Sequence, residues 1–84
     1  MELMETATMM GSKDYKERFK AEYYQVKIRT EKLKAMLEKY KTGTLNFTPS
    51  CSYELLHAQL VHMKDYERCL SERALIEGID LEEV

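Results

Sequence analysis

The chain has 84 residues, a third of them charged, with three glycines, one proline and a net charge of −2. A chain of this length forms one domain with a small core, which usually needs disulfides, a metal or oligomerisation for support. The composition is typical of a helical, soluble protein. No apolar run approaches the roughly 20 residues of a membrane span. The N-terminus also lacks the basic and apolar regions of a signal peptide, so we expect no membrane partner and a cytoplasmic location.

Residues 1–11 contain four methionines and no clear apolar periodicity. We therefore interpret them as a flexible N-terminal extension, with room for a short helix. Residues 12–84 are expected to form a single helical domain.

The first long helix is predicted over residues 13–41, because its apolar positions alternate in steps of four and three. Such spacing forms a heptad seam. Ser12 is the expected N-cap, with Asp14 in the first turn, and Gly43 is the expected C-cap. The seam consists of Phe19, Tyr23, Val26, Thr30, Leu33, Leu37 and Tyr40.

The connector, residues 42–50, is rich in turn-forming residues. Within it, Leu45 and Phe47 alternate with polar residues and are expected to pack under the helix ends. Pro49 and the serines after it indicate the start of a second helix, over residues 51–77, which ends at Gly78. Its seam again follows steps of four and three, at Leu56, Leu60, Met63, Glu67, Leu70 and Ala74.

Both helices carry a second partly apolar stripe beside the seam. A hairpin covers one face of each helix, so these stripes predict self-association. The predicted fold is all-α: a hairpin of two long antiparallel helices that assembles into a helical homo-oligomer. The stripes are Tyr24 and Ile28 on the first helix, and Tyr66, Cys69, Arg73 and Ile76 on the second.

Charge is divided unevenly between the helices. Residues 13–41 carry a net charge of +5 and the rest of the chain carries −7. A lysine recurs every seven residues beside the first seam, at Lys13, Lys20, Lys27, Lys34 and Lys41. One interpretation is that these lysines pair with acids of the second helix, such as Glu54, Glu67 and Glu72. The other is a cationic row that holds phosphates.

The cysteines and histidines do not indicate a site. Cys51 and Cys69 are 18 residues apart on one predicted helix, about 27 Å, whereas a disulfide needs Cα atoms within about 7 Å. Semi-buried thiols are expected. Together with His57 and His62 they lack the spacing of a metal site. No cofactor is expected, and the absence of a glycine-rich phosphate loop or a nucleophile elbow favours a binding module over an enzyme.

Two tyrosines outside the seam have basic neighbours at helical spacing. Arg18 follows Tyr15 by three residues, and Lys20 and Lys27 flank Tyr24. A tyrosine ring can stack on a nucleobase while a cation holds phosphate, although the same residues suit an oligomer interface. The net negative charge disfavours duplex nucleic acid, but a local patch can hold a small ligand with two or three phosphates.

Three segments together resemble a known family. They are DYKERFKAEY, RTEKLKAML and LHAQLVHMKDYERCLSER, which span about residues 14–77. Their order and spacing are similar to those of small helical phage anti-CBASS sponges. These proteins sequester the cyclic oligonucleotides that bacteria use as antiviral signals.

The resemblance implies a symmetric oligomer, a hexamer, with cyclic dinucleotides bound between protomers in the cytosol of an infected bacterium. Some members of the family also bind cyclic trinucleotides elsewhere, through arginines of the C-terminal helix. Matched residue by residue, Tyr15 would stack a base and Lys32 would hold phosphate. We add Arg18 and Arg29 on their chemistry, because none of these four residues has an evident structural role. The resemblance also implies a second site, for which Arg68 and Arg73 are the candidates.

Two other functions stay open. The connector TGTLNFTPSC and the tail EGIDLEEV depart from the family pattern, so the signal could be a cyclic ADP-ribose derivative. Alternatively, the acidic second helix docks on a host or phage protein and the chain binds no nucleotide.

Overall fold

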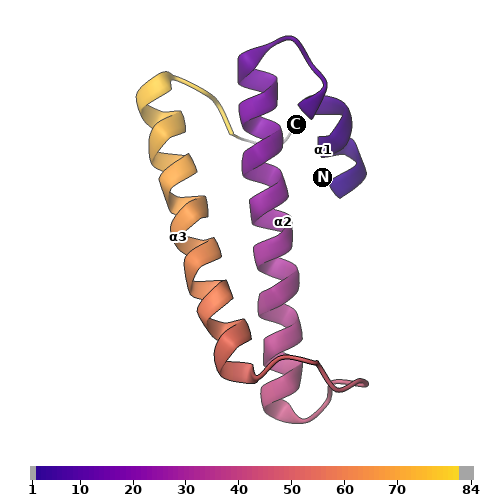
Figure 1. Cartoon of the computed structure of the whole chain (residues 1–84). Helices are drawn as coiled ribbons and strands as arrows, with labels where there is room; N and C mark the ends of the chain where they lie inside the picture. The colour runs from indigo at the N-terminus through magenta and orange to yellow at the C-terminus, as the bar shows by residue number, and fades with distance from the viewer. Residues whose placement is uncertain (1, 82–84) are drawn as a thin grey trace.

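The computed structural model describes residues 2–81 and places three helices in them: α1 (Leu3–Met10), α2 (Tyr15–Thr42) and α3 (Tyr53–Glu77). Figure 1 shows α2 between α1 and α3, with α2 and α3 antiparallel and the connector at the far end from α1. The molecule measures 43 × 24 × 20 Å. The prediction of an all-α chain is confirmed, while assembly into an oligomer stays a prediction. Within residues 2–81, no helix is both long enough and apolar enough to cross a membrane.

The core lies between α2 and α3, where the heptad pattern predicts it. Its centre is a cluster of four buried side chains, and Tyr23, Val26 and Leu81 pack against that cluster. On α3, every position of the predicted seam is buried or partly buried. The seam therefore defines how the two long helices pack. The central cluster consists of Phe19, Leu70, Ala74 and Ile79.

The N-terminal segment differs from the expected flexible extension. Leu3–Met10 forms helix α1, which packs on the N-terminal half of α2 (Figure 1). Thr6 is fully buried, and its hydroxyl donates a hydrogen bond to the carbonyl of Leu3 at 2.5 Å. An isolated helix this short is marginal in water, so packing on α2 stabilises it. Periodicity within α1 alone does not reveal that contact.

Tyr24 was predicted to lie on a second stripe that the hairpin leaves uncovered, but it is buried. Its side chain is only 2% exposed, and Ala21, three residues earlier on α2, is 0% exposed. After Gly78 the chain folds back, so that Ile79 joins the core and the Tyr24 hydroxyl donates to the Leu81 carbonyl. This part of the second stripe on α2 is therefore covered by the chain itself. It does not require a second copy.

The helix ends fix the position of the connector. The N-cap of α2 is Asp14 and not the expected Ser12. The Asp14 side chain accepts a hydrogen bond from the Lys16 amide at 2.9 Å, and the Ser12 hydroxyl accepts one from the Asp14 amide. Gly43 and Gly78 have φ angles of 76° and 71°, which confirms them as left-handed C-caps. The carbonyls of the last turn of α2 accept from the amides of Gly43 and Thr44, so the chain turns sharply at this end.

Candidate functional site

The four residues predicted for the first site lie at two separate places on α2. Tyr15 and Lys32 are 17 residues apart in one helix, which corresponds to about 25 Å. Tyr15 and Arg18 lie at the α1 end of the hairpin, and Arg29 and Lys32 lie toward the connector. Within one protomer, therefore, the four residues do not form a single site.

At the α1 end, the predicted residues bind one another. The Tyr15 hydroxyl donates to Glu77 Oε1 at 2.7 Å and accepts from Arg73 Nη2 at 3.2 Å. Arg73 also pairs with Glu77 at 3.4 Å, and its guanidinium lies 4.9 Å from the centre of the Phe19 ring. The hydrogen bond to Glu77 raises the pKa of Tyr15, because the carboxylate favours the protonated phenol. Each polar group of this cluster has a protein partner.

Two further arginines of the predicted sets also have partners. Arg18 donates to the Ser12 carbonyl at 2.9 Å, which ties α2 to the segment before it. Arg68 pairs with Asp65 at 3.8 Å and with Glu72 at 3.3 Å along α3. The expectation that Tyr15 and Arg18 have no structural role is therefore wrong. Both make hydrogen bonds within the protein.

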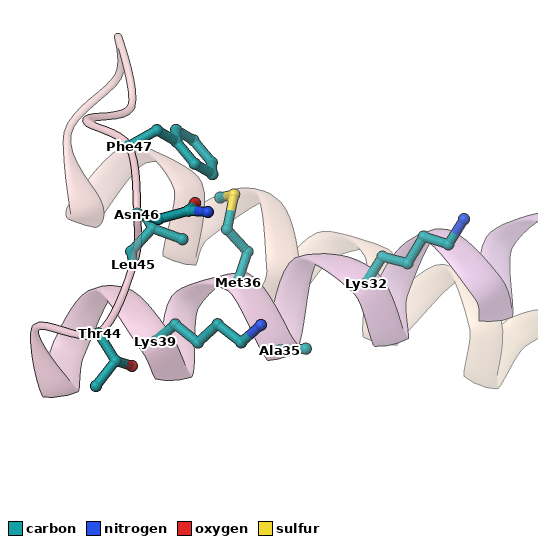
Figure 2. Close-up of a pocket in the computed structure, with 8 residues that line it drawn as sticks. All are labelled: Lys32, Ala35, Met36, Lys39, Thr44, Leu45, Asn46 and Phe47. Carbon is teal, nitrogen blue, oxygen red and sulfur yellow. The ribbon is translucent and has the colours of Figure 1, made fainter.

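At the connector end, a shallow pocket of about 360 Å³ lies between α2 and the connector. The turn at Gly43 brings the connector over α2, and Figure 2 shows Met36 rising from the helix toward Asn46 and the ring of Phe47. The floor is therefore apolar, and Asn46 and Thr44 add polar groups at the wall. The lining residues are Lys32, Ala35, Met36, Lys39, Thr44, Leu45, Asn46 and Phe47.

The lysines of this pocket have no recorded carboxylate partner among the described residues. Lys32, Met36 and Lys39 follow in steps of four and three, so they share one face of α2. Neither lysine takes part in an ion pair among residues 2–81, where the recorded ion pairs all lie within α3. Arg29, also exposed, stands three residues before Lys32 on the same face. The pocket thus combines lysines that have no ion-pair partner among the described residues with an apolar surface.

Within residues 2–81, the seven-spaced lysines do not form the ion pairs with α3 that one interpretation expected. No ion pair joins them to an acid within the described part of the chain, and Glu72 pairs instead with Arg68 on its own helix. The surface of α2 therefore retains its positive charge, which raises the local concentration of anions despite the net charge of the chain.

Sequence reasoning missed Lys39, Met36 and Phe47 as members of a site. Phe47 was expected to pack under a helix end, but its side chain is 54% exposed and lines the pocket. Two features of the sequence could have indicated this site. Phe47 is an aromatic residue between the turn formers Asn46 and Pro49, and Lys39 follows Lys32 by seven residues. The connector is irregular, so the apolar spacing of the helices does not predict that the connector packs on α2.

The cysteines and histidines show no metal site in the described region. Cys51 and Cys69 are free and exposed, which corrects the expectation of semi-buried thiols. Among residues 2–81, no group of three His, Cys, Asp or Glu side chains is placed to hold a metal ion.

A comparison with protein families decides the family of the chain. A family model described as Sequestin matches residues 13–76. The chain belongs to the Sequestin family. Its name denotes sequestration, so membership supports a sequestering role for this protein. No curated protein and no solved structure matches the chain.

The Sequestin match includes the whole connector pocket. It covers α2, the connector and α3 up to its last turn, and it leaves out α1. The family match therefore contains both the pocket lysines and Phe47, together with the hairpin that positions them.

Proposed function

We propose that this Sequestin-family protein sequesters a cyclic oligonucleotide immune signal without cleaving it, and that the connector pocket binds the signal. One observation carries the proposal. Lys32 and Lys39, which have no ion-pair partner among residues 2–81, flank an apolar floor formed by Met36 and the exposed ring of Phe47.

The chemistry of the pocket suits a nucleotide. An ammonium group forms charge-assisted hydrogen bonds with phosphate oxygens, and an exposed aromatic ring stacks on a base. Asn46, at the pocket wall, supplies an amide that can hydrogen-bond a base edge. Binding alone lowers the free concentration of a signal by mass action, so sequestration needs no catalytic group.

The resemblance assigns base stacking to Tyr15, which gives a second arrangement of the site. Because Tyr15 lies about 25 Å from Lys32 along α2, one small ligand contacts both only if they come from different protomers. Such a site is part of a homo-oligomer, for which the resemblance implies a hexamer. Our proposal places the ligand in the pocket of one protomer, so Tyr15 is expected to be dispensable for binding.

Two alternatives keep specific support. The pocket volume of about 360 Å³ is near the low end of ligand pockets, about 300–1,000 Å³, which also suits a compact cyclic ADP-ribose signal. An interaction protein is favoured by the last turns of α3, where Leu75 and Ile76 are 85% and 84% exposed. Exposed apolar side chains together with acidic neighbours are typical of a docking surface.

Calorimetry and native mass spectrometry with cyclic di-AMP, cyclic di-GMP, a cyclic trinucleotide and cyclic ADP-ribose test the proposal. We expect saturable binding of a cyclic oligonucleotide and recovery of the intact ligand after the protein is denatured. The same spectra report how many protomers assemble. Binding of cyclic ADP-ribose alone supports the second ligand class, and no heat with any member of the panel contradicts nucleotide sequestration.

A further inference from the structure

We propose that the nucleotide site continues around the tip of the hairpin into a second base-stacking subsite, formed by Tyr40 and Tyr53 beside Lys41. This inference rests on the proposed function and deepens it. It states that the preferred ligand carries two bases, one on Phe47 and one on the tyrosine pair.

The connector pocket is continuous with two further depressions at the tip of the hairpin. The connector pocket shares Leu45 and Phe47 with a neighbouring depression of about 230 Å³, which is also lined by Tyr40. Tyr40 in turn lines a third depression of about 330 Å³, together with Lys41 and Tyr53. The three concave regions are therefore adjacent, and a ligand larger than one nucleotide can follow them from Phe47 to Tyr53.

Aromatic side chains lie close together at the tip of the hairpin. The rings of Tyr40 and Tyr53 lie 5.5 Å apart at 57°, and Tyr53 and His57 are stacked at 5.9 Å and 18°. Neither the Tyr40 nor the Tyr53 hydroxyl has a recorded hydrogen-bond partner among residues 2–81. The hydroxyls of Tyr15, Tyr24 and Tyr66, in contrast, all bind protein groups.

Tyr23, whose hydroxyl also has no recorded partner among the described residues, packs against the core cluster, whereas Tyr40 and Tyr53 line the concave surface at the tip. A tyrosine ring offers a flat face to any base, and stacking of this kind tolerates different bases. Preorganised rings lose little side-chain freedom when a ligand binds. The Tyr40–Tyr53 pair is thus suited to hold a planar group that reaches it along the surface.

The tip of the hairpin also carries positive charge. Lys41 is exposed and, within the described residues, takes part in no ion pair. It precedes the turn at Gly43, so it belongs to the same end of α2 as Lys39. Glu54 lines the same depression. Its carboxylate accepts hydrogen bonds from N–H groups of a base and repels phosphate, which favours phosphate at Lys41.

The test compares a ligand with two bases and a ligand with one. Cyclic di-AMP and AMP are titrated into the full chain and into Tyr53→Leu, Tyr53→Phe and Lys41→Gln. Loss of one stacked base is expected to weaken cyclic di-AMP binding to Tyr53→Leu by roughly 5- to 150-fold. Binding of AMP is expected to change less, so the ratio of the two affinities falls. Tyr53→Phe, which keeps the ring, is expected to bind as the unchanged protein does.

Two controls keep the test decisive. Tyr66→Leu removes an exposed tyrosine from the middle of α3 and is expected to leave both affinities unchanged. Lys41→Gln replaces a surface lysine without touching the ring packing, and we expect it to weaken cyclic di-AMP binding by roughly threefold or more. This variant decides the question if circular dichroism shows that Tyr53→Leu does not fold.

The outcomes separate this inference from the proposed function. If Tyr53→Leu and Lys41→Gln bind cyclic di-AMP normally while Phe47→Ala does not, the second subsite is wrong and the connector pocket stands. If the unchanged protein binds neither cyclic di-AMP nor any other member of the nucleotide panel, the proposed function fails and this inference fails with it.

Discussion

The two ends of the helical hairpin carry similar residue types but use them differently. At the α1 end, Tyr15, Arg73 and Glu77 bind one another, and the Arg73 guanidinium lies over Phe19. At the connector end, Lys32 and Lys39 flank the exposed ring of Phe47 with no ion pair in the described chain. Cations and aromatics in a sequence therefore indicate a site only where the protein leaves them without partners.

The two ends of the hairpin therefore contribute differently to folding stability and to ligand binding. Contacts at the α1 end close the core with the segment after Gly78 and hold α1 and α3 on α2. The side chains of the connector pocket contribute less to the core, because Phe47 is 54% exposed and both pocket lysines are exposed. We expect substitutions at the first end to change stability and substitutions at the second end to change ligand affinity.

The largest expected effect is on stability at the α1 end. Leu70 is 1% exposed in the central cluster, so Leu70→Ala should lower the free energy of unfolding by about 2–5 kcal/mol. Leu55→Ala, on the same helix but at a 61% exposed side chain, should change it by no more than about 0.5 kcal/mol. Urea denaturation measures both. Equal losses would contradict the assignment of the core.

The next effect separates the two candidate aromatic residues. Phe47→Ala should weaken cyclic dinucleotide binding by about 1–3 kcal/mol through loss of base stacking, with little change in unfolding. Tyr15→Ala should leave the affinity unchanged and lower stability, because Tyr15 bridges Arg73 and Glu77. Calorimetry and thermal unfolding distinguish the two variants. If Tyr15→Ala abolishes binding, the ligand instead lies between protomers, as the resemblance implies.

The smallest expected effect concerns pH. The Tyr66 hydroxyl donates to Glu22, and this hydrogen bond raises the pKa of Tyr66 above its usual value of about 10. A raised folded-state pKa means that the protonated phenol stabilises the fold below pH about 10, and that this contribution is lost as the pH rises through the folded-state pKa.

Urea unfolding of Tyr66→Phe between pH 7 and 11 measures this contribution. The variant should be less stable than the unchanged protein at neutral pH, and the difference should shrink at high pH. Tyr53→Phe serves as the control, because the Tyr53 hydroxyl has no recorded partner among residues 2–81. A constant difference for Tyr66→Phe across the pH range would contradict the role of the Glu22 hydrogen bond.

Periodicity predicted the parts of the fold that depend on contacts between two long helices. The seam on α3, from Leu56 to Ala74, and the caps at Gly43 and Gly78 follow from spacing and backbone chemistry alone. The burial of Tyr24 does not, because its hydroxyl bonds to Leu81 in the segment after α3. That segment has no periodic pattern of its own.

The site was predictable only in part, for the same reason. Lys32 lines the pocket, but its partners Met36, Lys39 and Phe47 become neighbours through the turn at Gly43. Tyr15 and Arg18 have basic and aromatic chemistry equal to that of the pocket residues. Only their contacts with Glu77 and the Ser12 carbonyl show that they serve the fold.

Calorimetry of the Lys32→Gln/Lys39→Gln double variant tests the central claim most directly. A charge-assisted hydrogen bond contributes about 1.5–3 kcal/mol, so loss of both lysines should weaken cyclic dinucleotide binding by roughly 100-fold or more with the fold intact. Lys13→Gln/Lys20→Gln is the matched control, with the same charge change and the same seven-residue separation, and should bind as the unchanged protein does. Equal affinities for the two double variants would contradict the connector pocket as the binding site.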